Sequence, residues 1–302
     1  MSVEVGNQLQ VAYIAEVTPG TTPGTPTGQA LRFVTFSLAA DRNYLKNPEL
    51  RTDRQNAAGR GGCIVGKGEL GGVFSYATYD DFLAAALCSA WDANVVKIGT
   101  TKKTFTIEKK YLVNTLCFPF THVVVDSFEL SGKADQNIEI KFGLIAGSCG
   151  TETGTTIWTS VTPANTNAVH TSWQGSVKKG GVAVGTVTSW TLKGNNKHQE
   201  AKVCGSANLY DLRAMSADIT GTIDLYFDSY SLYTDFRAEN TVALQINIGD
   251  GTTKSYVFDL ASCKITKHGA PSTADGLVSV TVEFESYTHS DTALKITRIP
   301  GA

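Results

Sequence analysis

The sequence is poor in charged residues. Aspartate, glutamate, lysine and arginine make up 18% of the 302 residues, whereas about a quarter is usual. The formal net charge of −2 does not suggest a basic nucleic-acid-binding protein. No run of about 18 apolar residues exists, and the first residues lack the basic region and apolar core of a signal peptide. These absences predict a protein without a membrane span. Low surface charge often means that much of the surface is covered in an assembly.

Patterns that carry enzyme or metal chemistry are also missing. The six cysteines include no C-x-x-C pair, so zinc is not expected and free thiols in a reducing compartment are predicted. The five histidines are isolated, without H-E-x-x-H spacing, and no G-x-S-x-G motif occurs. The segment Gly99–Lys102 does not end as a phosphate-binding loop does, and it is expected to be a turn. The sequence therefore predicts no enzyme, no cofactor and no metal site.

The composition instead indicates an all-β protein with minor α. Threonine, glycine, valine and serine dominate, and a hydrophobic content of 42% is enough for a core. The segment Val65–Tyr76 alternates with a period of two, which predicts a strand. It leads directly into a short amphipathic helix up to Leu87, for which Thr78 is the expected N-cap and Asp81 its partner.

The strand–helix unit occurs twice. Ile219–Phe227 reads as a second such strand, and Ser231–Phe236 as a second helix start. Other matches follow in the same order. They are Tyr79/Tyr233, Asp81/Asp235, Phe82/Phe236 and Phe36/Trp190, each 154 positions apart, and Ile138/Val278, Phe142/Val282 and Leu144/Phe284, each 140 apart. A duplicated domain explains these matches, and the alternative is two unrelated halves with a similar β-sandwich rhythm. We predict two tandem β-sandwich or half-barrel domains, each with one short flanking helix.

The predicted division of the chain follows composition. Residues 1–30 are interpreted as an extended arm, because the segment Thr18–Pro26 is too rich in proline and glycine for a helix. This arm is either a flexible linker or a segment that lies on a neighbouring subunit. Residues 31–148 form the first domain, the Gly/Thr/Ser/Asn-rich residues 149–172 a linker, and residues 173–302 the second domain.

Several segments together resemble one known family, the duplicated-domain tail tube proteins (major tail proteins) of long-tailed, non-contractile bacteriophages. The resemblance covers nearly the whole chain and depends on the order and spacing of its segments. These segments are Glu16–Pro23, Leu31–Phe33, Glu49–Gln55, Gly68–Leu87, Ser231–Phe236 and Ile296–Arg298. The second long loop departs from the first, because Ala201–Ala207 lacks an Arg-x-Asp-Arg pattern, and this leaves its contact role open.

The resemblance implies a structural virion protein. In this family, rings stack head to tail into a hollow tail tube through which DNA reaches the host. The implied partners are other copies of the chain, other phage tail proteins at the tube ends and transiently passing DNA, with no membrane. The implied location is the virion tail, after assembly in the host cytoplasm. Two tube domains in each chain predict rings of three chains with pseudo-sixfold symmetry. The alternative is six chains, with one domain in the wall and the other outside.

Two sets of site residues follow within this reading. The loop at residues 43–62 is long and of mixed charge, and its Arg51, Asp53 and Arg54 are predicted to stack one ring on the next. Outward-facing strand carboxylates are predicted to line the lumen and to form an acidic surface that repels phosphate. They are Glu69, Glu129, Glu139, Asp224, Glu283 and Glu285. With Asp228 included, the outward strand faces carry seven carboxylates and two lysines, Lys67 and Lys141.

The sequence also allows a second functional class. A two-domain β-sandwich adhesin or a carbohydrate-binding tail decoration would expose aromatic side chains along a groove. Trp158, Trp173 and Trp190 lie near the linker and would serve such a groove, or they would pack the junction between the domains.

Overall fold

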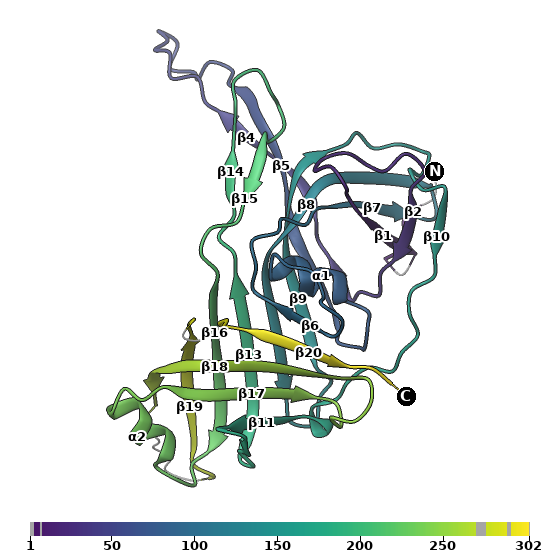
Figure 1. Ribbon diagram of the computed structural model, residues 1–302. Helices are drawn as coiled ribbons and strands as arrows, with labels where there is room; N and C mark the ends of the chain where they lie inside the picture. Colours follow the sequence, from purple (N-terminus) through teal and green to yellow (C-terminus); the bar gives the residue numbers. More distant parts are fainter. Residues whose placement is uncertain (1–2, 7, 270–275, 289–290, 302) are drawn as a thin grey trace.

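A computed structural model describes residues 3–6, 8–269, 276–288 and 291–301 of the chain. The described residues form an 18-stranded system of paired strands, a separate two-stranded hairpin and two short α-helices (Figure 1). The predicted all-β fold with minor α is confirmed. Within the described ranges, no helix is long and apolar enough to cross a membrane.

The first half of the chain contains nine strands and the helix α1. Its elements are β1 (Leu9–Ala15), β2 (Thr27–Ala30), β3 (Thr35–Phe36), β4 (Ala39–Leu45), β5 (Arg60–Val73), α1 (Asp80–Ala86), β6 (Val95–Lys97), β7 (Phe105–Tyr111), β8 (Leu116–Lys133) and β9 (Glu139–Cys149). The rest of the chain begins with a connection that carries β10. Its elements are β10 (Ser160–Thr162), the 3-10 turn η1 (Ser172–Gln174), β11 (Ser176–Lys179), β12 (Val182–Ala183), β13 (Val187–Asn195), β14 (Gln199–Ala201), β15 (Asp211–Arg213), β16 (Asp218–Tyr226), α2 (Ser231–Arg237), β17 (Val242–Ile248), β18 (Ser255–His268), β19 (Ser279–Ser286) and β20 (Lys295–Ile299).

One antiparallel sheet runs through both halves, and we call it the long sheet. Its strand order is β4-β5-β9-β8-β13-β16-β19-β18. The halves meet where β13 pairs with β8, from Ser189 opposite Lys133 to Asn195 opposite Ser127. Side chains alternate between the two faces of a strand, and one face of the long sheet is apolar and buried. Its core residues include Leu70, Phe142, Leu192, Ile223 and Phe284.

The same strand pairings occur in both halves in the same order. The pairings β1–β7, β7–β8, β8–β9 and β5–β9 of the first half correspond to β11–β17, β17–β18, β18–β19 and β16–β19 of the second. The register recurs as well. Phe36 pairs with Leu70 and Leu70 with Phe142, just as Trp190 pairs with Ile223 and Ile223 with Val282. These correspondences agree with the sequence spacings, and the duplicated domain stays a prediction.

The two helices differ in burial, although they occupy equivalent places in the chain order. Phe82, Leu83 and the three alanines of α1 are buried inside the first half, whereas no residue of α2 is buried. The predicted N-cap is wrong. The helix begins at Asp80 after Tyr79, without a side-chain cap, and the Thr78 hydroxyl instead lies 2.6 Å from that of Ser75.

Long-range contacts of the first helical turn join the halves. The Tyr256 hydroxyl donates to Asp80 at 2.5 Å, and Arg298 donates to the second carboxylate oxygen of Asp80 at 2.7 Å. Beside them β20 pairs with β6 of the first half. The two halves therefore share this junction as well as the long sheet.

Part of the N-terminal segment is built into the chain's own sheets. Strand β1 pairs along its whole length with β7, and β2 pairs with both β1 and β10. Residues 9–15 and 27–30 are therefore part of the chain's own sheets. Neither interpretation of residues 1–30, a flexible linker or a segment on a neighbouring subunit, describes these two strands.

The polar face of the long sheet and a projecting hairpin

All six carboxylates that the sequence singled out lie on the polar face of the long sheet. The strand register places them there, because directly opposed residues of antiparallel strands share a face. Glu129 is opposite Lys141 on one side and Lys193 on the other. Glu139 is in register with Val73, and Glu69 with Gly143. On the second half, Asp224, Glu283 and Glu285 oppose Thr281, Thr222 and Thr220.

The same face carries more lysines than the sequence count included. They are Lys67, Lys133, Lys141, Lys193, Lys264 and Lys267. With Asp41 and Asp218 added, eight carboxylates stand against six lysines, a net charge of −2. Lys193 and Lys267 form ion pairs with Glu129 and Glu283, at 3.0 and 2.8 Å. The expected acidic face is thus corrected to a nearly balanced, hydroxyl-rich one.

The centre of this face is shallowly hollowed where the halves meet. A depression of about 320 Å³ lies over β5, β8, β9, β13 and β16. Its lining includes Glu69, Glu129, Lys141, Lys193 and Asp218, charged side chains of both signs. Ligand sites in proteins are mostly apolar with a few converging polar groups. This depression has the character of a hydrated surface instead.

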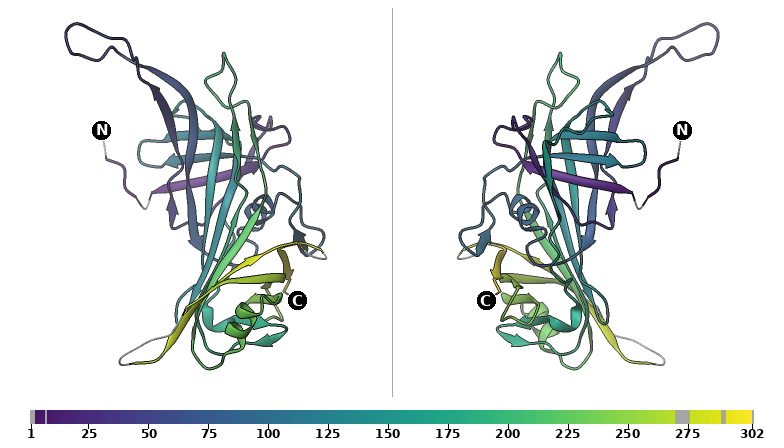
Figure 2. Two further views of the ribbon diagram at one scale, coloured as in Figure 1. Left: turned by 90° about the vertical axis from the view of Figure 1, so that its left-hand side faces the viewer. Right: turned by 90° about the vertical axis from the view of Figure 1, so that its right-hand side faces the viewer.

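The loop at residues 43–62, which we call the arm, extends beyond the body of the molecule as a continuation of the β4–β5 hairpin (Figure 2). Arg51 forms two parallel hydrogen bonds with Asp53, at 3.0 and 2.8 Å. The hydrogen bond from Arg51 lowers the pKa of Asp53 below its ordinary value. Tyr44 and Leu50 are exposed, Leu50 completely. Thus the structure places Arg51, Asp53 and Arg54 together on this projection.

Residues 196–213, which we call the short hairpin, project next to the arm but are anchored to the body. Leu209 and Leu212 pack with Val65 and Val124 of the long sheet. Asp211 forms an ion pair with Lys102, and the Lys102 amine also lies 2.6 Å from His122. Burial alone would raise the pKa of Asp211, but hydrogen bonds from Lys102, the Leu212 amide and Arg213 outweigh it and lower the pKa to about 2.

The anchor of the short hairpin predicts a pH-dependent stability. A carboxyl whose folded pKa lies below its ordinary 3.8 stabilises the fold above that value, and this contribution is lost as the pH falls toward 2. Solvent screening reduces the expected effect to about 1 kcal/mol. Between pH 5 and 2.5, the unfolding free energy of Asp211→Asn should therefore fall by about 1 kcal/mol less than that of the original chain. Denaturant titration of unassembled protein measures this. Asp218→Asn, which removes the exposed pair with Lys197, is the control, and parallel curves for Asp211→Asn and the original chain would refute the anchor.

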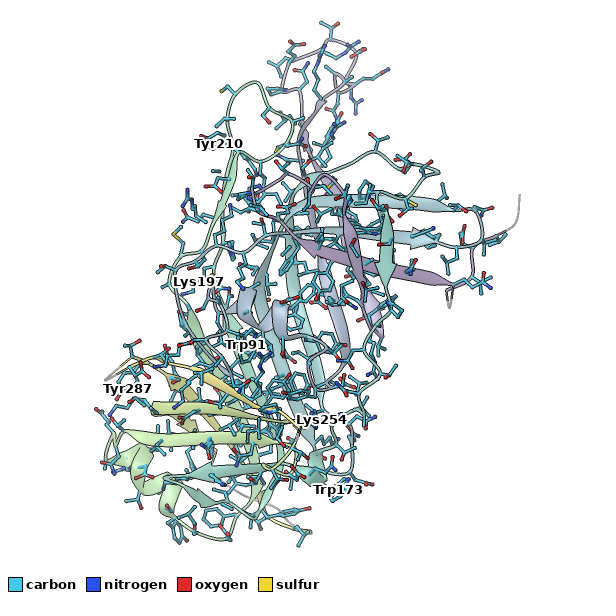
Figure 3. The ribbon with its side chains drawn as sticks, turned by 45° about the vertical axis from the view of Figure 1, so that its right-hand side comes forward. Trp91, Trp173, Lys197, Tyr210, Lys254 and Tyr287 are labelled. Carbon is cyan, nitrogen blue, oxygen red and sulfur yellow. The ribbon has the colours of Figure 1, made fainter. Side chains whose placement is uncertain are left out.

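The three tryptophans near the connection do not form one aromatic groove. Trp158 and Trp190 are buried against Gly28 and Gly132, respectively. Trp173 on η1 is 78% exposed near the lower end of the molecule (Figure 3), and it shares the lining of one depression with the buried Trp190. Sequence reasoning grouped the three by position, and only burial separates them.

Comparison with known proteins gives one family. The family model described as "Phage tail tube protein" matches residues 6–286. A comparison with curated proteins found no match.

Proposed function

Because the chain belongs to the phage tail tube protein family, we propose that three copies close into a ring whose inner wall is the long sheet. The role of the protein is structural, in the tail tube of the virion, where it assembles with copies of itself and meets other tail proteins. The observation that carries the ring proposal is that both halves contribute to one sheet through β8 and β13. The two domains of the proposed wall are residues 31–148 and 173–302, joined by the linker at residues 149–172.

The size of the proposed wall follows from strand number. The long sheet has eight strands in each chain, so three chains would supply 24. Closed barrels of roughly 16–18 strands already leave an aqueous channel, and 24 strands would enclose a wider one. Closure of the ring also removes the free edges of the sheet. Exposed edge strands otherwise pair with other chains and lead to aggregation.

The polar face is the one that fits the lumen. The opposite face is buried under the other strands and α1, so only the polar face remains for water and DNA. DNA binds proteins largely by releasing counterions from its phosphates to lysine and arginine. On this face the lysines are outnumbered by carboxylates, and serine and threonine fill much of the rest. Such a surface hydrates the channel and gives passing DNA no excess positive charge.

The arm is the proposed contact between stacked rings. It projects from one end of the long sheet, and Arg51, Asp53 and Arg54 contribute nothing to the core. The tube would then deliver DNA without catalysis, after assembly in the host cytoplasm. The adhesin alternative gains no support, because two of its three tryptophans are buried.

Charge reversal on the lumen face should slow DNA ejection without preventing assembly. Glu69, Asp224 and Glu285 form no ion pair within the described ranges, so their replacement by lysine leaves existing ion pairs intact. The change raises the net charge by six per chain, 18 per proposed ring, and the new lysines would bind phosphate. We expect normal tubes, with ejection that is slower and more dependent on salt.

Ejection kinetics of phage carrying the triple lysine variant, measured at several salt concentrations, test this. The matched control reverses three exposed carboxylates outside the long sheet, Asp92, Glu152 and Glu239. If ejection by the two variants is equally fast and equally salt-dependent, the polar face does not line the channel.

A further inference from the structure

The end of the molecule opposite the arm carries a groove at the junction of the halves, which we call the seam groove. It consists of two depressions of about 330 and 510 Å³ that share Asp135 and Trp173 in their lining. The first depression lies beside the start of β13, and the second beside the start of β9. Figure 3 shows Trp173 at the lower end and the arm at the upper end of the molecule. A head-to-tail stack brings these two ends together.

The exposed indole of Trp173 is held on a fixed turn. The Ser172 hydroxyl donates to the Lys133 carbonyl at 2.7 Å, and the Ser172 amide donates to the Gln136 carbonyl at 3.0 Å. Val177 and Trp190 form the floor of the groove next to it and are buried. A rigid, solvent-exposed tryptophan beside an apolar floor is typical of the few residues that dominate the energy of a protein interface.

The outer part of the groove is negatively charged. Its lining contains the carboxylates Asp135 and Glu139 and neither lysine nor arginine. Both carboxylates are exposed, and neither forms a salt bridge with any residue in the described part of the chain. This leaves two carboxylates free to pair with a cationic partner.

The arm has the complementary properties. It carries four cations and two carboxylates, a net charge of +2: Lys46, Arg51, Arg54 and Arg60 against Glu49 and Asp53. Leu45 and Leu50 are exposed, Leu50 fully, on a segment that has no core of its own to bury them. The tip of the short hairpin, around Cys204–Ser206, carries the half-exposed Val203 but no leucine and no cluster of arginines.

We propose that the seam groove of one chain receives the arm of a second copy in the adjoining ring. Leu50 packs against Trp173, and the arm's arginines pair with Asp135 and Glu139. The contact is heterologous, since the two surfaces differ and lie at opposite ends, and such contacts generate open stacks. The inference rests on the proposed stacking role of the arm and names the surface that it meets.

Photo-crosslinking tests the contact directly. With p-benzoylphenylalanine in place of Leu50, irradiated tubes should give covalent dimers in which the crosslinked peptide contains Trp173. The variant Trp173→Ala should form normal rings, while the critical concentration for tube growth rises by at least about tenfold, because an interface anchor is lost. Trp173→Phe should restore most of the loss. Tyr230→Ala removes another exposed aromatic side chain, next to α2, and serves as the control.

Exchanging charges between the two surfaces gives a second test. Asp135→Arg with Glu139→Arg should block tube growth, and adding Arg51→Glu and Arg54→Glu should partly restore it. If tubes require the arm but grow normally with Trp173→Ala, and Leu50 crosslinks elsewhere, the seam groove is overturned while the stacking role of the arm stands. If removing the arm's charges also leaves tubes normal, the stacking role itself fails.

Discussion

A chain in which Arg51, Asp53 and Arg54 are all replaced by alanine is expected to fold and to form rings, but not long tubes. The three side chains are exposed and do not contribute to the core. Arg51 and Asp53 bond to each other, and Asp53 also accepts a hydrogen bond from the Gln55 amide at 3.2 Å. Removing them therefore costs little folding free energy. In a stack the same change removes polar contacts at every chain of every ring.

Tube lengths in electron micrographs and the ring population in sedimentation measure this effect together. We expect rings to accumulate and mean tube length to fall by at least about tenfold, as the loss of several interface contacts per ring requires. The matched control removes one exposed ion pair that lies outside the arm, Lys97→Ala with Asp291→Ala. Tubes of normal length from the arm variant would show that ring stacking depends on another surface.

The faces of the long sheet were predictable because alternation is a local property of the sequence. In segments such as 138–144, every second residue is apolar, and the structure buries those residues. The six carboxylates accordingly share one face, although nothing in the sequence defined which strands adjoin. The missed lysines show the limit of this reasoning. Lys133 ends a strand and Lys267 follows a register shift in β18, so neither belongs to a clear alternating run.

Features that depend on distant partners were not predictable. Thr78 was expected to cap α1, but Asp80 and Asp81 are held by Tyr256 and Tyr13, far away in the sequence. These tertiary contacts favour a different helix start from the one that local capping rules indicate. Similarly, the sequence assigns β1 to an extended N-terminal segment, because its partner β7 begins about 90 residues later. Sequence position alone also did not distinguish exposed Trp173 from buried Trp190.

The two ends of the long sheet suggest how chains join within a ring. Strand β4 pairs only with β5, and residues 264–268 of β18 pair only with β19, within the described residues. Inside the chain, the equivalent strands β13 and β8 pair with Asn195 opposite Ser127. Applying the repeat spacings of 154 and 140 to this register places Asp41 opposite Lys267 of the neighbouring chain. Opposite charges at directly opposed strand positions are stabilising.

Replacing Asp41 by arginine should therefore weaken ring closure. A like-charge pair in place of an opposite-charge pair costs roughly 0.5–1 kcal/mol, and three pairs per ring give about 2 kcal/mol, or roughly thirtyfold in the ring equilibrium. The double variant with Lys267→Asp should recover most of this loss, which a merely misfolded chain would not do. Ring populations from analytical ultracentrifugation give both numbers. Failure of the second change to rescue the first would exclude this register.

Rotational averaging of end-on tube images then decides between three chains and six. With six chains, only one half would lie in the wall, and the other half would appear as an outer knob. That arrangement separates the halves, whereas in this chain they share seven consecutive backbone pairings between β13 and β8. A chain that keeps these pairings places both halves in one wall. We therefore expect threefold symmetry with a sixfold-like outline, and true sixfold symmetry with outer knobs would require the β8–β13 pairing to break on assembly.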